Sequence, residues 1–282
     1  MKENKKTTNG VWSFLKYLSL VFFSFVAVLP IVSCVITALK TKEEYEQTNV
    51  MTMPANIFNF SNFGEAFRTA NMGRAFGNSF VILVFVLLIS TLMGTQLAYI
   101  LNRFKFKGNS IIRGLFLFAT LLPGIAMQVS VFEIMTNLHL INKLYGYIIM
   151  MCGTDIISIY VYIQYFENIP TSLDESGIMD GANYFRIYRS ILLPLLKPAI
   201  VTSCILKGVG TYNEYYAANL YLQDKKTLAT VATSLYTFVG PLGSQYNLIC
   251  AGVIISLVPA LIIFILFQKQ IYSGLAAGAV KG

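Results

Sequence analysis

The stretch Glu175-Ser-Gly-Ile-Met-Asp-Gly-Ala182, which continues to Leu193-Pro-Leu195 and Pro198, is polar, helix-forming and short. It lies between two long apolar runs in a chain that is 56% hydrophobic and only 12% charged. Soluble domains carry about a quarter charged residues, so this composition excludes an ordinary soluble globular protein. A polar segment confined between apolar runs has no role within lipid itself. The whole connection that contains it, residues 168–198, is called here the 168–198 loop. We therefore predict that this loop contacts a soluble partner.

The apolar residues are collected into long blocks. No Asp, Glu, Lys or Arg occurs between Arg74 and Arg103, or between Lys226 and Lys269. Runs of roughly 18 or more apolar residues are long enough to cross the hydrocarbon layer as helices. We expect an all-α, polytopic membrane protein forming a single domain over residues 1–282. Its six predicted spans cover residues 16–39, 77–101, 113–135, 145–166, 199–220 and 247–268.

The positive charges are distributed unequally over the connections between these spans. If the N-terminus is cytoplasmic, thirteen of the 21 Lys and Arg residues fall on the cytoplasmic side and seven on the other, with Lys207 inside a span. Cytoplasmic loops of membrane proteins carry an excess of Lys and Arg. Both termini and the 168–198 loop are therefore predicted to be cytoplasmic. The net charge of +8 follows this topology, and no basic patch interleaved with aromatic residues predicts nucleic acid as a partner.

The first apolar run resembles a secretion signal, and Ile31-Val-Ser-Cys34 resembles a lipoprotein cleavage box. A cleaved signal has an apolar core of roughly 7–15 residues, and this run is longer. We therefore expect an uncleaved first span in which Cys34 is a packing residue. The four cysteines all lie in predicted spans and have no metal-like spacing.

The 168–198 loop is expected to form two helices joined by a sharp turn. Residues 170–174 predict a helix start, with a Thr/Ser cap and acidic residues in the first turn. Asp180-Gly181 is a turn dipeptide in which glycine can adopt a positive φ. A second helix over residues 184–192 carries four apolar residues at helical spacing, and two prolines end it. These apolar residues are Phe185, Tyr188, Ile191 and Leu192, and the prolines are Pro194 and Pro198.

The spacing of this loop resembles the signature loop of ABC-importer permeases. There a Glu-Ala-Ala triplet is followed three residues later by Asp-Gly-Ala and then by a Leu-Pro-Leu exit. Glu175 and Asp180-Gly181-Ala182 keep that spacing, whereas Ser176-Gly177 replace the two alanines and are expected to loosen the first helix. The resemblance implies that the loop docks on an ATPase. The residues it implicates are Glu175, Ser176, Gly177, Met179, Asp180, Gly181, Ala182 and Phe185.

An amphipathic linker lying on the membrane surface is the alternative interpretation of this loop. It is less consistent with the sequence, because a surface linker needs no fixed spacing of Glu, Asp-Gly and Pro.

The C-terminal residues 274–282 resemble the tail of the sugar-import branch, specifically the second permease of maltose-type systems. Similar segments occur at residues 98–107, 122–124 and 210–214, so the resemblance covers nearly the whole chain. It implies a cytoplasmic tail, about residues 269–282, that faces the ATPase through Gly274, Leu275, Gly278 and Lys281. It also implies a second homologous permease, two ATPase subunits that bind ATP and Mg, an extracytoplasmic sugar-binding protein, and a bacterial cytoplasmic membrane. The chain itself is expected to hold no cofactor.

Ionisable groups within spans are energetically expensive and are functional candidates by default. Glu133 lies close enough to the outer surface to reach water. Asp155 fits either a functional group or a helix-packing group. Lys207 and Glu214 are two helical turns apart, which is too far for direct pairing.

Aromatic faces beside amides and a carboxylate suit sugars, although tyrosines near an interface also serve as anchors. The predicted substrate path is Lys207, Val209, Tyr212, Asn213, Glu214 and Tyr216.

The sequence contains no Ser-His-Asp set, phosphate-binding Gly-Lys-Ser/Thr loop, metal cluster or redox pair. An enzyme is therefore not expected, and ATP hydrolysis must reside in another subunit. We expect a permease subunit of an ATP-driven carbohydrate importer that works by alternating access. One alternative is the same architecture importing a polyamine or phosphate, against which the 274–282 tail argues. The other is a secondary transporter working alone, which usually shows inverted repeats, and none is visible here.

Overall fold

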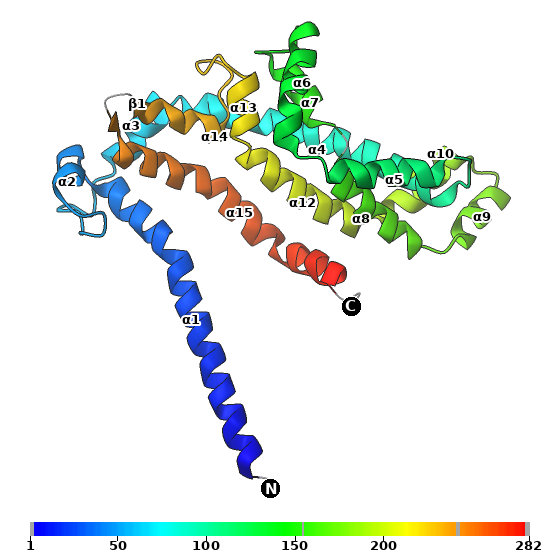
Figure 1. Cartoon of the computed structure of the whole chain (residues 1–282), viewed down its shortest axis with the longest axis horizontal. Helices are drawn as coiled ribbons and strands as arrows, with labels where there is room; N and C mark the ends of the chain where they lie inside the picture. The colour runs from blue at the N-terminus through cyan, green and yellow to red at the C-terminus, as the bar shows by residue number, and fades with distance from the viewer. Residues whose placement is uncertain (1–2, 154, 241–242, 280–282) are drawn as a thin grey trace. The chain divides into compact units, whose positions relative to one another are not determined.

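The computed structural model describes the backbone of residues 3–153, 155–240 and 243–279, and the side chains from Trp12 to Gln268 within those ranges. Regular structure in these residues is helical apart from one two-residue hairpin, which confirms the all-α prediction (Figure 1). The chain divides into two compact units. The first combines Met1–Met72 with Leu235–Pro259, and the second combines Gly73–Ser234 with Ala260–Gly282. Each unit is described by itself.

The first unit is built around polar contacts where α1 ends and α15 begins. Its elements are α1 (Glu3–Leu39), α2 (Lys42–Gln47), α3 (Ser61–Thr69), the 3₁₀-helix η2 (Leu235–Phe238), β1 (Val239–Gly240), β2 (Gly243–Ser244) and the first part of α15 (Tyr246–Ala279). The buried Asn62 amide donates to the carbonyl oxygens of Ala38 at 2.8 Å and Lys40 at 2.7 Å, and it accepts from Asn247 at 3.1 Å. The first bond satisfies one of the last carbonyls of α1, which have no partner within the helix, and the second holds the residue that follows it.

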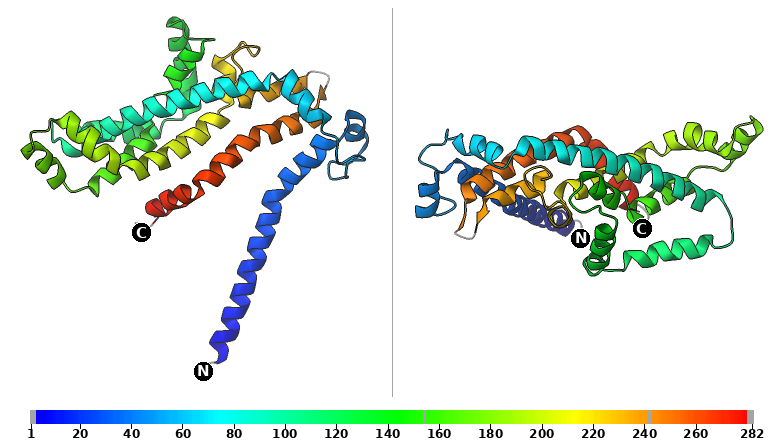
Figure 2. Two further views of the ribbon diagram at one scale, coloured as in Figure 1. Left: turned by 180° about the vertical axis from the view of Figure 1, so that it is seen from behind. Right: turned by 90° about the horizontal axis from the view of Figure 1, so that it is seen from above.

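The second unit contains the remaining helices. They are α4 (Met72–Arg103), α5 (Asn109–Thr120), α6 (Gly124–Asn137), α7 (Leu144–Met151), α8 (Ile156–Glu167), α9 (Ser172–Met179), α10 (Tyr184–Ile187), the π-helix η1 (Tyr188–Leu192), α11 (Leu193–Leu195), α12 (Lys197–Asn213), α13 (Tyr216–Tyr221) and α14 (Val231–Ser234). The helices α4, α8 and α12 lie side by side (Figure 2). A small residue allows this approach at Gly94, where an added Cβ would lie 3.0 Å from the Tyr162 ring.

Three helices are long and apolar enough to cross a membrane, namely Trp12–Leu39, Met72–Arg103 and Tyr246–Gln268. Three further candidates are bent pairs, and the count within the described residues reaches six if each pair is one span. The bends are 104° between α5 and α6, 46° between α7 and α8, and 74° between Tyr184–Leu195 and Lys197–Asn213.

The predicted spans at 113–135, 145–166 and 199–220 are therefore not continuous helices. Pro123 begins a new helix after α5, because proline lacks a backbone N–H and disfavours a helical residue before it. Asp155 has extended backbone and caps the start of α8. Glu214 is likewise extended and separates α12 from α13. The first, second and sixth predicted spans agree with α1, α4 and α15.

Candidate functional site

The 168–198 loop begins with helix α9. Asp174 and Glu175 lie in its first turn, where the helix dipole favours negative charge. The predicted helix start is thus confirmed, but the Thr171 hydroxyl makes no capping hydrogen bond. The carbonyl oxygen of Thr171 instead accepts from the amides of Asp174 at 2.9 Å and Glu175 at 3.1 Å.

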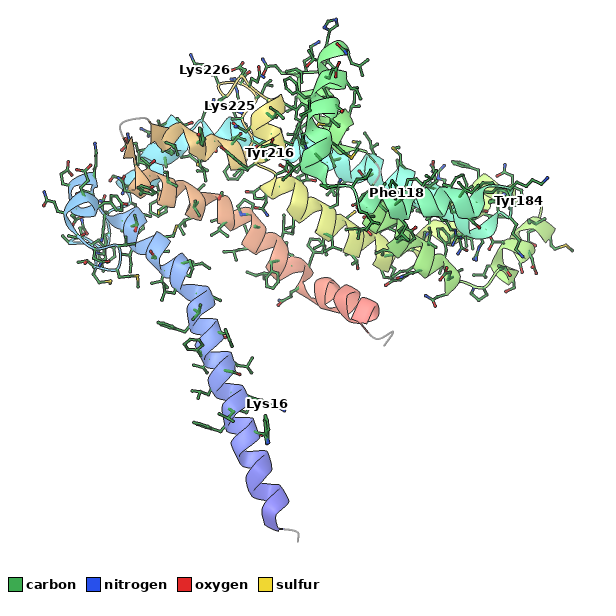
Figure 3. All side chains as sticks on the ribbon, viewed as in Figure 1. Lys16, Phe118, Tyr184, Tyr216, Lys225 and Lys226 are labelled. Atoms are coloured by element: carbon green, nitrogen blue, oxygen red, sulfur yellow. The ribbon has the colours of Figure 1, made fainter. Side chains whose placement is uncertain are left out.

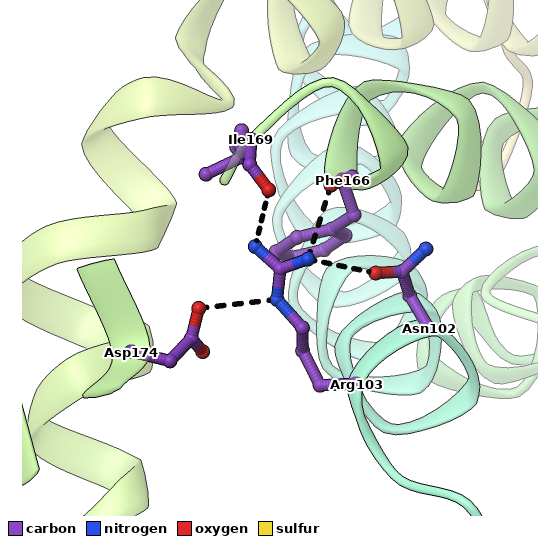
Figure 4. Close-up of polar contacts among 5 residues, drawn as sticks. All are labelled: Asn102, Arg103, Phe166, Ile169 and Asp174. Carbon is purple, nitrogen blue, oxygen red and sulfur yellow. Dashed lines mark hydrogen bonds and ion pairs between the residues drawn. The ribbon is translucent and has the colours of Figure 1, made fainter. Parts of the chain in front are cut away.

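A buried arginine fastens this loop to the end of α4 (Figure 4). The Nε of Arg103 lies 3.2 Å from a carboxylate oxygen of Asp174, and the two side chains are only 9% and 13% exposed. The guanidinium also donates to the carbonyl oxygens of Phe166 at 3.3 Å and Ile169 at 2.8 Å. One side chain therefore holds the end of α8, the following turn and the start of α9.

Sequence reasoning missed this anchor. Arg103 entered only the count of cytoplasmic charges and the 98–107 segment of the resemblance, and Asp174 only the acidic first turn of an expected helix. The two residues are far apart in the chain, so no local pattern joins them. The only available signal was an arginine at the end of a span, where a charge next to lipid needs a partner.

The turn between α9 and α10 is fixed by backbone hydrogen bonds. The amide of Ala182 donates to the carbonyl oxygen of Gly177, and that of Gly181 donates to Ile178, each at 2.9 Å. This pair of bonds is the Schellman motif that ends a helix on a left-handed residue. Gly181 has φ +77°, which confirms the expected positive φ. The side chain of Asn183 then accepts from the Arg186 amide at 2.8 Å and starts α10.

Gly177 is buried where α9 packs against the following helical turns. A Cβ added to it would lie 2.9 Å from Cγ1 of Ile187 and 3.2 Å from Cδ1 of Ile191. The expected loosening of the first helix is not seen, because α9 runs unbroken from Ser172 to Met179. The glycine instead permits a close approach that an alanine at this position would obstruct.

The second half of the loop packs on α4. Tyr188 and Leu192 are buried, and the Tyr188 hydroxyl lies 2.7 Å from Oγ1 of Thr95. Phe185 is 64% exposed, so it does not share a buried face with the other predicted apolar residues. The helical spacing behind that prediction is not kept, because η1 is wound as a π-helix rather than an α-helix. Pro194 does not end the helical run, which continues to Leu195 and bends at Leu196. Pro198 lies in the first turn of α12, where its missing N–H leaves no bond unmade.

The turn at Glu175–Ala182, called here the elbow, and the start of α10 beside it therefore present a mixed polar and apolar surface. Glu175 and Asp180 are exposed, and the apolar side chains among them are exposed as well. Met179 is 87% exposed, Tyr184 55% (labelled in Figure 3) and Phe185 64%. Exposed apolar groups within a polar rim are typical of surfaces that contact another protein.

The substrate-path residues are only partly brought together. Val209 and Asn213 are exposed on α12, and the Asn213 amide donates to the Val209 carbonyl oxygen at 3.0 Å. The break at Glu214 interrupts the predicted substrate path, because Tyr216 starts the next helix. The Glu214 carboxylate accepts from the Ala217 amide at 2.9 Å and therefore caps α13.

Two other candidates of the predicted path are less exposed. Tyr212 is half-buried on α12. Lys207 lies in a separate small cavity that it shares with Asp155.

The predicted ATPase-facing tail is helical, since α15 continues to Ala279. The backbones of Gly274, Leu275 and Gly278 lie within α15, but the side chain of Leu275 is outside the described residues, as is the whole of Lys281.

The segment after α13 is tied to the opposite end of α4 from the 168–198 loop. The Asn78 amide donates to the carbonyl oxygens of Thr227 and Ala229, each at 2.9 Å. A hydrogen bond from the Thr227 hydroxyl lowers the pKa of Asp224. Burial lowers the pKa of Lys225 (labelled in Figure 3), whose ammonium donates to two backbone carbonyls. Hydrogen bonds thus hold residues 222–230, which form no helix, between α13 and α14.

Comparison with known proteins identifies the family. Residues 90–275 match the family described as binding-protein-dependent transport system inner membrane component. The chain belongs to this family. It is therefore a membrane permease subunit of a transport system, not an enzyme.

Several relatives of this permease are named for the transport of carbohydrates. The probable starch degradation products transport permease AmyC of Thermoanaerobacterium thermosulfurigenes is 31% identical over 95% of this chain and 96% of its own. The arabinooligosaccharides permease AraQ of Halalkalibacterium halodurans is 27% identical over 99% of this chain and 100% of its own. A bacterial ABC transporter that imports alginate has a chain of the same fold, with a TM-score of 0.81 at 22% identity over 93% of this chain and 97% of that chain.

Proposed function

We propose that this permease forms part of an ATP-driven importer of oligosaccharides in a bacterial cytoplasmic membrane, with both termini in the cytoplasm. Its partners are a second permease, two ATPase subunits that bind ATP and Mg, and an extracytoplasmic sugar-binding protein. The names of its relatives support the choice of substrate class. The family's dependence on a binding protein supports the outer partner.

The observation that carries the coupling role is the rigid elbow at Glu175–Ala182. It presents an exposed carboxylate and exposed apolar side chains, and Arg103 fastens its base to α4. ATPase closure displaces this elbow, and the displacement passes through Leu196 to α12. The exposed side of α12 then changes its access from one side of the membrane to the other. This side carries Val209 and Asn213, with Tyr212 beside them and Tyr216 beyond the break.

Reversal of one charge tests the coupling role. In the assembled complex, Glu175→Lys should abolish uptake and the stimulation of ATP hydrolysis by the loaded binding protein. Glu167→Lys is the matched control, because Glu167 is also exposed and lies just before the loop, at the end of α8. Loss of activity in both variants, or in neither, would contradict a specific contact at Glu175.

The substrate class is tested separately with the same complex. Binding proteins loaded with oligosaccharides should stimulate ATP hydrolysis, whereas those loaded with a polyamine or phosphate should not. Stimulation by the latter alone would overturn the carbohydrate assignment while leaving the coupling role intact.

A further inference from the structure

A small cavity lies between α4, α8 and α12, within the part of the second unit that is proposed to cross the membrane. Its volume is about 10 Å³. That is close to the minimum, roughly 10–15 Å³, that holds one water molecule. Most of the residues that line it carry a polar side chain, which is unusual between apolar helices. The lining residues are Leu87, Ser90, Thr91, Asp155, Ser158, Tyr162, Ser203, Cys204 and Lys207.

Two opposite charges face this space. Asp155 caps α8, where its carboxylate accepts from the Ser158 hydroxyl at 2.8 Å. Lys207 reaches the same cavity from α12, and neither residue is in an ion pair closer than 4 Å with any residue the structure describes. A charge within the hydrocarbon region is costly unless it is paired or hydrated. Their common cavity therefore favours an indirect pairing of the two charges.

Two hydroxyls in the lining support a bound water. The side-chain oxygens of Ser90 and Ser203 are buried and have no hydrogen-bond partner in the described part of the chain, although Ser203 lies near the Tyr162 hydroxyl. Ser203 is only 2% exposed. Buried polar groups are normally satisfied, and a buried water typically makes two to four hydrogen bonds. The carboxylate, the ammonium and these hydroxyls offer that number of partners.

Water can reach the site from a larger neighbouring cavity. That cavity has a volume of about 290 Å³, and Ser90 and Asp155 line both spaces. It extends along α4 past Gly94 and Gln96 to Ile100. The small site thus adjoins a space that is large enough for several water molecules.

We propose that one water molecule bound in the small cavity bridges the Asp155 carboxylate to the Lys207 ammonium and hydrogen-bonds to Ser203 and Ser90. The bridged ion pair fastens α12 to α8 inside the membrane. This role is separate from transport itself, and it assigns Lys207 to helix positioning rather than to sugar binding.

The pairing of the charges is tested by neutralising them one at a time and together. Asp155→Asn keeps a side-chain oxygen for the Ser158 bond, and Lys207→Met keeps the aliphatic stem. Each single change leaves an unpaired charge and should lower the melting temperature of the purified complex by about 10 °C, whereas the double variant should regain most of this loss. The matched control is a double variant that combines Lys207→Met with Glu133→Gln, a change at another carboxylate of the spans. It should regain none of the melting temperature that Lys207→Met loses. A double variant no more stable than the worse single variant would overturn the pairing.

The bound water is tested by whether a smaller substitution raises or lowers the melting temperature. If Ser203 binds water, Ser203→Ala should lower the melting temperature, because a hydrogen bond is lost. If its hydroxyl is truly unpartnered, the change should raise the melting temperature. Thr211→Val is the control, since the buried Thr211 hydroxyl also has no described partner but does not line the cavity. A rise in both variants would overturn the bound water. Both tests measure stability, so they succeed or fail independently of uptake.

Discussion

Two glycines in the 168–198 loop serve different purposes. Gly177 is required by its neighbours, because a Cβ would collide with Ile187. Gly181 is required by its backbone, because φ is +77° although no atom would contact a Cβ within 4 Å. Glycine is therefore needed for two different reasons at positions only four residues apart: crowding at the first and backbone conformation at the second.

At Gly181, the backbone requirement predicts that asparagine is tolerated and valine is not. A left-handed conformation costs roughly 1–2 kcal/mol for an ordinary residue, and asparagine adopts it more readily than a β-branched residue does. Gly181→Asn should retain binding-protein-stimulated ATP hydrolysis, whereas Gly181→Val should lose most of it with membrane insertion unchanged. Equal activity in both variants would show that the turn conformation is unimportant.

At Gly177, the packing requirement predicts that the residue typical of the resembled family is harmful. Gly177→Ala places a methyl group against Ile187, and overpacking of this kind costs about 1–3 kcal/mol. Ser176→Ala, the same replacement at the neighbouring exposed position, should change the free energy of unfolding by less than about 0.5 kcal/mol. Thermal unfolding of the two variants checks this difference. An equally stable Gly177→Ala variant would show that Ile187 yields without cost.

At the scale of the helices, the apolar runs of the sequence predicted where the spans lie but not where they break. Hydropathy measures length and composition, whereas each break depends on one residue. Pro123 removes an amide, Asp155 caps a new helix and Glu214 caps another. The helix, turn and positive φ of the elbow were predictable because they depend on neighbours in sequence. The Arg103–Asp174 pair and the fit at Gly177 were not, since they join distant segments.

The Arg103 anchor predicts a strong effect at the junction of α4 and α9. Removing one partner of a nearly buried ion pair costs about 3–5 kcal/mol, so Asp174→Asn and Arg103→Gln should both lower the melting temperature and the coupling of ATP hydrolysis to uptake. Arg103→Lys should rescue only part of the loss, because lysine cannot donate to the carbonyls of Phe166 and Ile169 in the same geometry. The exposed Arg189→Lys is the control and should behave as the unmodified protein. Full rescue by lysine would mean that charge alone matters.

At the scale of the whole molecule, the proposed topology places opposite ends of α4 on opposite sides of the membrane. The 168–198 loop is held at its Arg103 end, and the segment around Thr227 at its Asn78 end. In a variant lacking the four native cysteines, a cysteine at Lys226 should react with a membrane-impermeant thiol reagent in intact cells. A cysteine at Met179 should react only in inverted vesicles. The reversed pattern would invert the assigned orientation, and labelling of both from one side would contradict the single crossing proposed between them.

The position of Arg103 has a consequence for the evolution and exchange of such subunits. The elbow is one continuous stretch of sequence, yet its base is held by a side chain from α4, which lies well before it in the chain. A chimera that receives residues 168–198 from another permease would inherit the elbow without its anchor. Only grafts that also transplant a matching arginine, or whose recipient already has one at that place, should yield a productive hybrid.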